Sequence, residues 1–127
     1  MARVSVARLS VNQLSNITII RIFGKVSFDE LVDAMKQFYP MVVCHIIWDL
    51  TDSNFDNVTA GEFRKLPPIA KELLIHRVSG GKTAYVSPVD ITYGLLRMYT
   101  MIAEHSVLPY ERNVFRRIED AIEWLES

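Results

Sequence analysis

The chain has 127 residues, of which 50% are hydrophobic and 23% are charged, so it is large and apolar enough to form one globular domain over residues 1–127. This composition excludes a disordered tail, and a net charge of −1 excludes the broad positive surface that is typical of nucleic-acid binders. We therefore expect a folded domain whose partners are not nucleic acids.

The first third of the chain predicts a β-hairpin followed by a helix. Apolar and polar side chains alternate over residues 4–9, which is typical of an edge strand, and the β-branched stretch 17–23 follows after a short polar turn. Ser27 and Glu30 have the spacing of a capping box, in which the side chain of each residue bonds to the backbone of the other. A helix is expected to begin there and to end at Pro40.

The middle of the chain predicts a buried strand and an interrupted helix. Residues 42–50 are nearly all apolar, as expected of a strand that is buried on both faces of a parallel sheet. Thr59 and Glu62 form a second capping box. The prolines at 67–68 lack backbone N–H donors, so the helix that follows Thr59 must bend or split near them.

The last third of the chain repeats the alternation of strands and helices. Residues 82–86 and 111–115 predict strands, Asp90 is the expected N-cap of a helix that Pro109 ends, and residues 118–125 predict a final helix. The order ββαβαβαβα predicts an α/β fold with a five-stranded, mixed, mostly parallel sheet and about four helices.

This topology raises the question of how the sheet is covered. If the strands lie in sequential order, right-handed crossovers put most helices on one face and leave the other face only partly covered. Residues 42–48 nevertheless carry apolar side chains toward both faces, and an uncovered apolar face would be larger than soluble monomers usually expose. Trp124 on the final helix is an aromatic residue of the kind that anchors interfaces. We therefore expect a homodimer.

The single cysteine and the apolar segments favour the cytoplasm. Cys44 cannot close an internal disulfide, which is typical of a reducing compartment, and its apolar surroundings predict that it is buried and unreactive. No apolar leader segment is evident in the first residues, and the longest apolar run, residues 41–48, is too short to cross a bilayer. We expect a cytoplasmic protein without stable membrane insertion.

Five parts of the chain form an ordered pattern. They are Gly24-Lys25-Val26-Ser27, Ile47-Trp48-Asp49-Leu50, Gly81-Lys82-Thr83-Ala84, Tyr93-Gly94-Leu95-Leu96-Arg97-Met98, and Val114-Phe115-Arg116 running to Ala121-Ile122-Glu123-Trp124-Leu125. Together they resemble the SpoIIAA-like family, which is related in fold to the STAS domains of anti-sigma-factor antagonists. The resemblance covers roughly residues 5–125. It implies the same five-stranded sheet in one STAS-like domain, but no activity.

The chain departs from this resemblance at two places. Phosphorylated STAS antagonists resemble one another in an Asp-Ser-Ser-Gly motif at the start of the helix after the central strand, whereas residues 56–61 here read Asp-Asn-Val-Thr-Ala-Gly. Thr59 is thus a candidate for phosphorylation, but a capping role with Glu62 explains it better. Arg117 precedes the last helix, where a cation is unfavourable unless it meets an anion.

Candidate ligand-binding residues lie at the carboxyl ends of the predicted strands, where open α/β sheets bind their ligands. Lys25, Arg116 and Arg117 could together hold a phosphate or carboxylate head group, or could be ordinary solvated residues. Asp49 could join its acidic neighbours in a metal site. No His or Cys lies at ligand spacing, however, so we favour an Asp49 that bonds to its own loop.

Two further features have both a functional and a structural interpretation. Tyr93 and Arg97 lie one helical turn apart and could form a polar lip over a pocket, or a packing pair with Gly94 serving helix–sheet contact. The many Met and aromatic residues could line an adaptable apolar pocket, although core filling explains them equally well. The histidines at positions 45, 76 and 105 have no Ser or Cys partner in view and are interpreted as structural.

The favoured function is that of a non-enzymatic, STAS-like binding or regulatory module that acts through protein–protein contact. No nucleophile–base pair, phosphate-binding loop or metal cluster can be assembled from the sequence, so we expect no catalytic residue, no cofactor and no metal. The alternative is a carrier or sensor of a small amphipathic, lipid-like ligand. The expected partners are accordingly a second copy of the chain, another protein or such a ligand.

Overall fold

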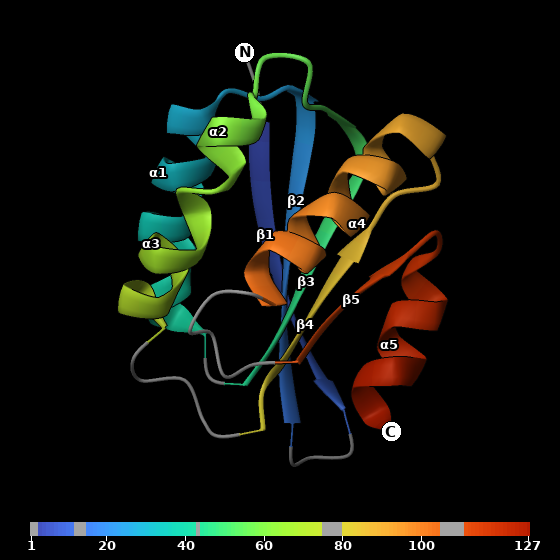
Figure 1. Cartoon of the computed structure of the whole chain (residues 1–127). Helices are drawn as coiled ribbons and strands as arrows, with labels where there is room; N and C mark the ends of the chain where they lie inside the picture. The colour runs from blue at the N-terminus through green and yellow to red at the C-terminus, as the bar shows by residue number, and fades with distance from the viewer. Residues whose placement is uncertain (1–2, 12–14, 43, 75–79, 105–110) are drawn as a thin grey trace.

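The computed structural model describes residues 3–11, 15–42, 44–74, 80–104 and 111–127 (Figure 1). The strands are β1 (Arg3–Val11), β2 (Ser15–Lys25), β3 (His45–Asn54), β4 (Lys82–Val86) and β5 (Glu111–Phe115). The α-helices are α1 (Phe28–Phe38), α2 (Ala60–Phe63), α3 (Leu66–Leu73), α4 (Asp90–Glu104) and α5 (Ile118–Glu126), and a 3-10 turn η1 (Tyr39–Met41) follows α1.

The five strands form one sheet in the order β1-β2-β3-β4-β5. At one edge β1 pairs antiparallel with β2, and every other neighbouring pair is parallel. In the centre Ile46 lies opposite Thr83, and Asp49 lies opposite Val86. The predicted mixed, mostly parallel sheet with an antiparallel edge strand is therefore confirmed, and its strands are in sequential order.

Both predicted capping boxes are present. The Ser27 hydroxyl oxygen accepts a hydrogen bond from the Glu30 backbone N–H at 3.2 Å, and the Glu30 carboxylate accepts one from the Ser27 N–H at 3.0 Å. The predicted second helix is split into α2 and α3. Its two prolines, at 67–68, lie in the first turn of α3, where their missing N–H groups would have no helical acceptor.

The helices cover the two faces of the sheet unequally. Side chains of α1, α3 and α4 pack with one face into the larger core cluster, which includes Met35, Leu66 and Tyr99. On the opposite face Ala121 and Leu125 of α5 pack against the sheet. The crossover helices share a face because right-handed β-α-β connections require it, whereas α5 follows the last strand and has no such restriction. Figure 1 shows α5 standing apart from the other helices.

The expected uncovered apolar face is not found in the described part of the chain. Ile47 is fully buried and Ile19 is 6% exposed, both in the cluster that α5 covers. Trp124 is half-buried against Phe115, with the Lys82 ammonium 5.1 Å from its ring centre, so it is not an exposed anchor. The large exposed hydrophobic side chains that the structure describes are Met41, Val89, Ile91 and Met101, all of them outside the strands. The predicted dimer surface is therefore wrong, and the homodimer itself stays a prediction.

Cys44 lies just before β3 and is half-buried, so the expectation of full burial is wrong. The helix of residues 90–104 begins at Asp90 itself, so Asp90 is its first residue and not its N-cap. Among the described helices, none combines the length and the apolar character that a membrane crossing needs.

Candidate functional site

The carboxyl ends of β4 and β5 meet the start of α4 in a small polar cluster. Arg116, which directly follows β5, donates a hydrogen bond from Nη1 to Asp90 Oδ1 at 2.6 Å. Its guanidinium carbon also lies 4.2 Å from the centre of the Tyr93 ring, a cation–π distance. These contacts hold the first turn of α4 against the end of β5.

The three basic residues expected to share one anion are not brought together. Lys25 ends β2, whereas Arg116 follows β5, and the two intervening strands separate these positions by roughly 14 Å at the usual strand spacing. Arg117 instead reaches Asp120 in the first turn of α5, with Nε 3.6 Å from Oδ2. That carboxylate is the anion that offsets a cation at the positive end of the helix.

The predicted pairing on α4 is also different in the structure. Tyr93 stacks against Arg116, and Arg97 is exposed to solvent. Gly94 is exposed as well, and a Cβ atom built on it would meet no atom within 4 Å. The interpretation that Gly94 permits helix–sheet contact is therefore wrong, because its open side faces away from the sheet.

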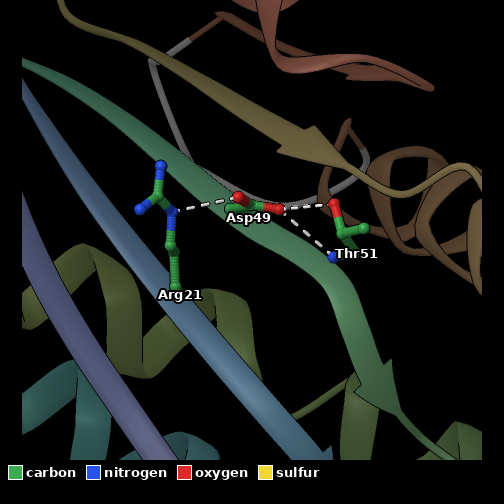
Figure 2. A network of polar contacts seen from close by, with 3 residues as sticks. All are labelled: Arg21, Asp49 and Thr51. Atoms are coloured by element: carbon green, nitrogen blue, oxygen red, sulfur yellow. Dashed lines mark hydrogen bonds and ion pairs between the residues drawn. The ribbon is translucent and has the colours of Figure 1, made fainter.

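Asp49 takes part in a network that joins β2 and β3, and Figure 2 shows its three members. Its Oδ2 accepts a hydrogen bond from Arg21 Nε at 3.1 Å, and its Oδ1 accepts bonds from the Thr51 N–H at 3.2 Å and the Thr51 hydroxyl at 2.6 Å. Asp49 does accept a bond from a nearby backbone N–H, as favoured, but Thr51 lies within β3 and not in the loop that was expected there. The network also borders a hollow of roughly 260 Å³, which Phe23 and Asp52 help to line.

Arg21 is the residue of this network that the sequence interpretation missed. It lies directly opposite Asp49 in the register of β2 and β3. The alternation of side chains along the two strands could have indicated this contact. Ile19 and Ile47 lie opposite each other two residues earlier, so Arg21 and Asp49 point to the same face of the sheet as they do. In the described ranges no three His, Cys, Asp or Glu side chains lie close enough together to hold a metal ion.

Thr59 has the geometry of a helix cap. Its hydroxyl oxygen accepts a hydrogen bond from the Glu62 N–H at 3.1 Å, and the Glu62 carboxylate accepts one from the Thr59 N–H at 2.9 Å. His45 likewise has a structural contact, since its Nδ1 accepts a hydrogen bond from the Lys82 N–H at 3.0 Å. The other two histidines, at 76 and 105, lie outside the described residues.

The larger core contains a cluster of tyrosines and one tryptophan. The Trp48 Nε1–H donates a hydrogen bond to the Tyr39 hydroxyl at 3.0 Å, and the rings of Tyr85 and Tyr99 meet edge to face at 5.7 Å. Burial raises the pKa of Tyr99 well above its usual value, and Tyr85 and Tyr39 raise it further. Tyr99 is therefore neutral at physiological pH.

A cavity of about 40 Å³ remains between these rings and the helices. Its lining is aromatic and aliphatic and includes Met35, Trp48 and Phe63. By comparison, an engineered apolar cavity that binds a single benzene molecule has a volume of about 150 Å³. Most of the Met and aromatic side chains thus fill the core, and the space left among them is smaller than a lipid-like ligand requires.

No protein-family model matches the chain, and no curated protein matches it. Among the solved structures that are similar, two cover nearly the whole chain. One is an uncharacterized protein of the DUF3478 family with a SpoIIAA-like fold from Shewanella loihica PV-4, with 11% identity and a TM-score of 0.60 over 98% of this chain and 95% of that chain. The other is an anti-sigma factor antagonist from Mycobacterium paratuberculosis, with 10% identity and a TM-score of 0.59 over 98% and 96% of the two chains. This chain therefore has a SpoIIAA-like fold, as the resemblance implied.

Proposed function

We propose that this chain is a non-enzymatic regulatory module that binds another protein chain through the exposed side of α4. We call this surface the α4 outer face and define it by one set of residues. They are the exposed Val89, which directly precedes α4, then Asp90, Ile91, Gly94, Arg97 and Met101, with the half-buried Met98, which also packs against the larger core cluster. Two of them carry the proposal, because Ile91 is 73% exposed and Met101 is 62% exposed, and large apolar side chains on a helix surface are typical of protein interfaces.

The comparison supports the same class of function. The structure from Mycobacterium paratuberculosis is named an anti-sigma factor antagonist, and such a protein acts on another protein. At 10% identity the likeness establishes the fold alone, so a regulatory contact is our proposal for this chain. We also propose a cytoplasmic location, on the basis of the single cysteine.

The residues considered for metal binding and for phosphorylation have structural contacts instead. Asp49 bonds to Arg21 and Thr51, and Thr59 bonds to Glu62. These contacts favour a binding module over an enzyme. The ligand-carrier alternative has less support, because the cavity of about 40 Å³ would have to open severalfold to admit an acyl chain.

Affinity capture with a matched pair of variants tests the proposal. Ile91→Glu places a charge on the α4 outer face, and Met41→Glu places the same charge on an exposed apolar residue of η1. We expect Ile91→Glu to lose a protein that the wild type and Met41→Glu both retain. Equal retention by all three proteins would contradict the proposal.

A further inference from the structure

We propose that the chain bound to the α4 outer face is a second copy of this one, packed antiparallel to it about a two-fold axis that passes beside Gly94. This inference rests on the proposed function and names the partner. It replaces the sheet face by a helix face as the contact surface between two copies.

Helix geometry divides the α4 outer face into two flanks. With about 3.6 residues per turn, Gly94 lies at the centre of the exposed side of α4. Asp90 and Arg97 lie on one flank, and the other flank carries the exposed Ile91 and the half-buried Met98, which also packs against the larger core. At the level of Gly94 the face thus has a charged edge, an apolar edge and no side chain between them, and two turns later Met101 lies close to the same central line.

Among the described residues, no contact within the chain requires a glycine at position 94. Glycine destabilises the interior of a helix relative to alanine, and a Cβ atom at this position would meet nothing within 4 Å. A glycine at the centre of an exposed helix face does, however, allow a second helix backbone to approach closely. Close approach of two α4 helices would therefore explain why position 94 is a glycine. The described contacts within one chain do not explain it.

The charges are complementary to those of a second copy. Asp90 and Arg97 are seven residues apart, which is two helical turns or about 10.5 Å along the axis. A two-fold axis at their midpoint, beside Gly94, turns the second helix antiparallel and places Asp90 next to the partner's Arg97. The same operation places Arg97 next to the partner's Asp90, so one symmetric contact forms two identical ion pairs.

The apolar flank matches under the same operation. Ile91 comes to lie beside the partner's Met98, and the two glycines face each other at the axis. A parallel two-fold arrangement would instead place the charged flank of each helix opposite the apolar flank of the other. Arg116 Nη1 lies 2.6 Å from Asp90 Oδ1 and so orients the Asp90 carboxylate within its own chain. The Asp90 side chain is nevertheless 88% exposed and can reach a partner. Both flanks thus favour a second copy over an unrelated protein.

Sedimentation at micromolar concentrations tests the inference. We expect the wild type to form a dimer with twice the monomer mass of 14.6 kDa. Gly94→Leu blocks the close approach and should give a monomer, although leucine is the better helix former and has free space in its own chain. Gly61→Leu, at an exposed glycine of α2, is the matched control and should remain a dimer.

A charge exchange makes the test specific for this geometry. Arg97→Glu alone, and Asp90→Lys alone, each place like charges together at both ion pairs and should weaken the dimer on the order of tenfold. An equimolar mixture of the two variants restores both attractions and should form heterodimers. Arg64→Glu, at an exposed arginine after α2, should dimerise like the wild type.

The outcomes separate this inference from the proposed function. A wild type that stays at 14.6 kDa, or a dimer that survives Gly94→Leu, would overturn the inference. If the wild type is a monomer and captures another protein, and Ile91→Glu abolishes that capture, the proposed function stands. Only the identification of the partner as a second copy is then wrong. If capture does not depend on Ile91, both are wrong.

Discussion

Arg21 Nε lies 3.1 Å from Asp49 Oδ2, and this contact joins the charged parts of β2 and β3 on the sheet face that also carries α5 (Figure 2). The register of the two strands produces it, because Arg21 and Asp49 are direct neighbours across the parallel pair. The second carboxylate oxygen of Asp49 is bonded to Thr51. Both carboxylate oxygens of Asp49 thus have hydrogen-bond partners within the chain.

Asp49→Ala should lower the free energy of unfolding by about 1–2 kcal/mol, because Thr51 loses two hydrogen bonds in a half-buried place. The ion pair with Arg21 should add little, since the Arg21 side chain is 45% exposed. Asp52→Ala, at the exposed neighbour, is the control and should change stability by less than about 0.5 kcal/mol. Urea denaturation measures both, and equal effects would show that the network does not stabilise the fold.

Thr59 should behave as a cap and not as a switch. Thr59→Ala should cost about 1 kcal/mol of stability, because the Glu62 N–H loses its acceptor, whereas Thr59→Ser and Thr59→Asp should keep most of it. Thermal unfolding measures the series. If Thr59→Asp alters binding of a partner while Thr59→Ser does not, negative charge at this position is a signal and the capping account is incomplete.

Two exposed glycines should respond in opposite ways to alanine. At concentrations where the monomer prevails, Gly94→Ala should raise the free energy of unfolding by about 1 kcal/mol, since Gly94 lies inside a helix. Gly80→Ala should lower it by roughly 1 kcal/mol, because Gly80 has a φ of 87°. Neither methyl group would contact another atom within 4 Å, so the difference isolates backbone conformation. Stabilisation by both substitutions would contradict this.

Stability should fall in alkaline solution because of Tyr99. Burial raises the pKa of Tyr99 in the folded state above the value of about 10 that it has when unfolded, so its contribution is fully present below that pH and is lost as the pH rises further. Tyr99→Phe should therefore show a flatter decline of stability above about pH 10 than the wild type. Denaturant titrations at several pH values measure this. Parallel curves for the two proteins would rule out Tyr99 as the cause.

Local patterns predicted the elements, because their causes are local. The capping boxes at Ser27 and Thr59 each depend on residues three positions apart, and both are present. The alternation and the apolar runs likewise predicted the strands, and with right-handed connections they predicted the sequential sheet. The split of the second helix followed from its prolines, although the break occurs just before them.

Contacts between distant elements could not be predicted in the same way. Arg116 lies 26 residues from Asp90 in sequence, and only the pairing of β4 with β5 brings the end of β5 to the start of α4. Lys25 was grouped with Arg116 because both follow strands, but the edge of a five-stranded sheet is too wide for them to meet. The face expected to be open is covered because α5 follows the last strand and is free to pack there.

If two copies meet at the α4 outer face, a disulfide can join them across the two-fold axis. In a Cys44→Ser background, Gly94→Cys would place its only thiol at the two-fold axis, within the Cα separation of about 6 Å that a disulfide needs. Mild oxidation should convert this variant to a covalent dimer in non-reducing electrophoresis, much faster than Met41→Cys in the same background. If the two variants cross-link at the same slow rate, α4 does not pair with α4 and the account is wrong.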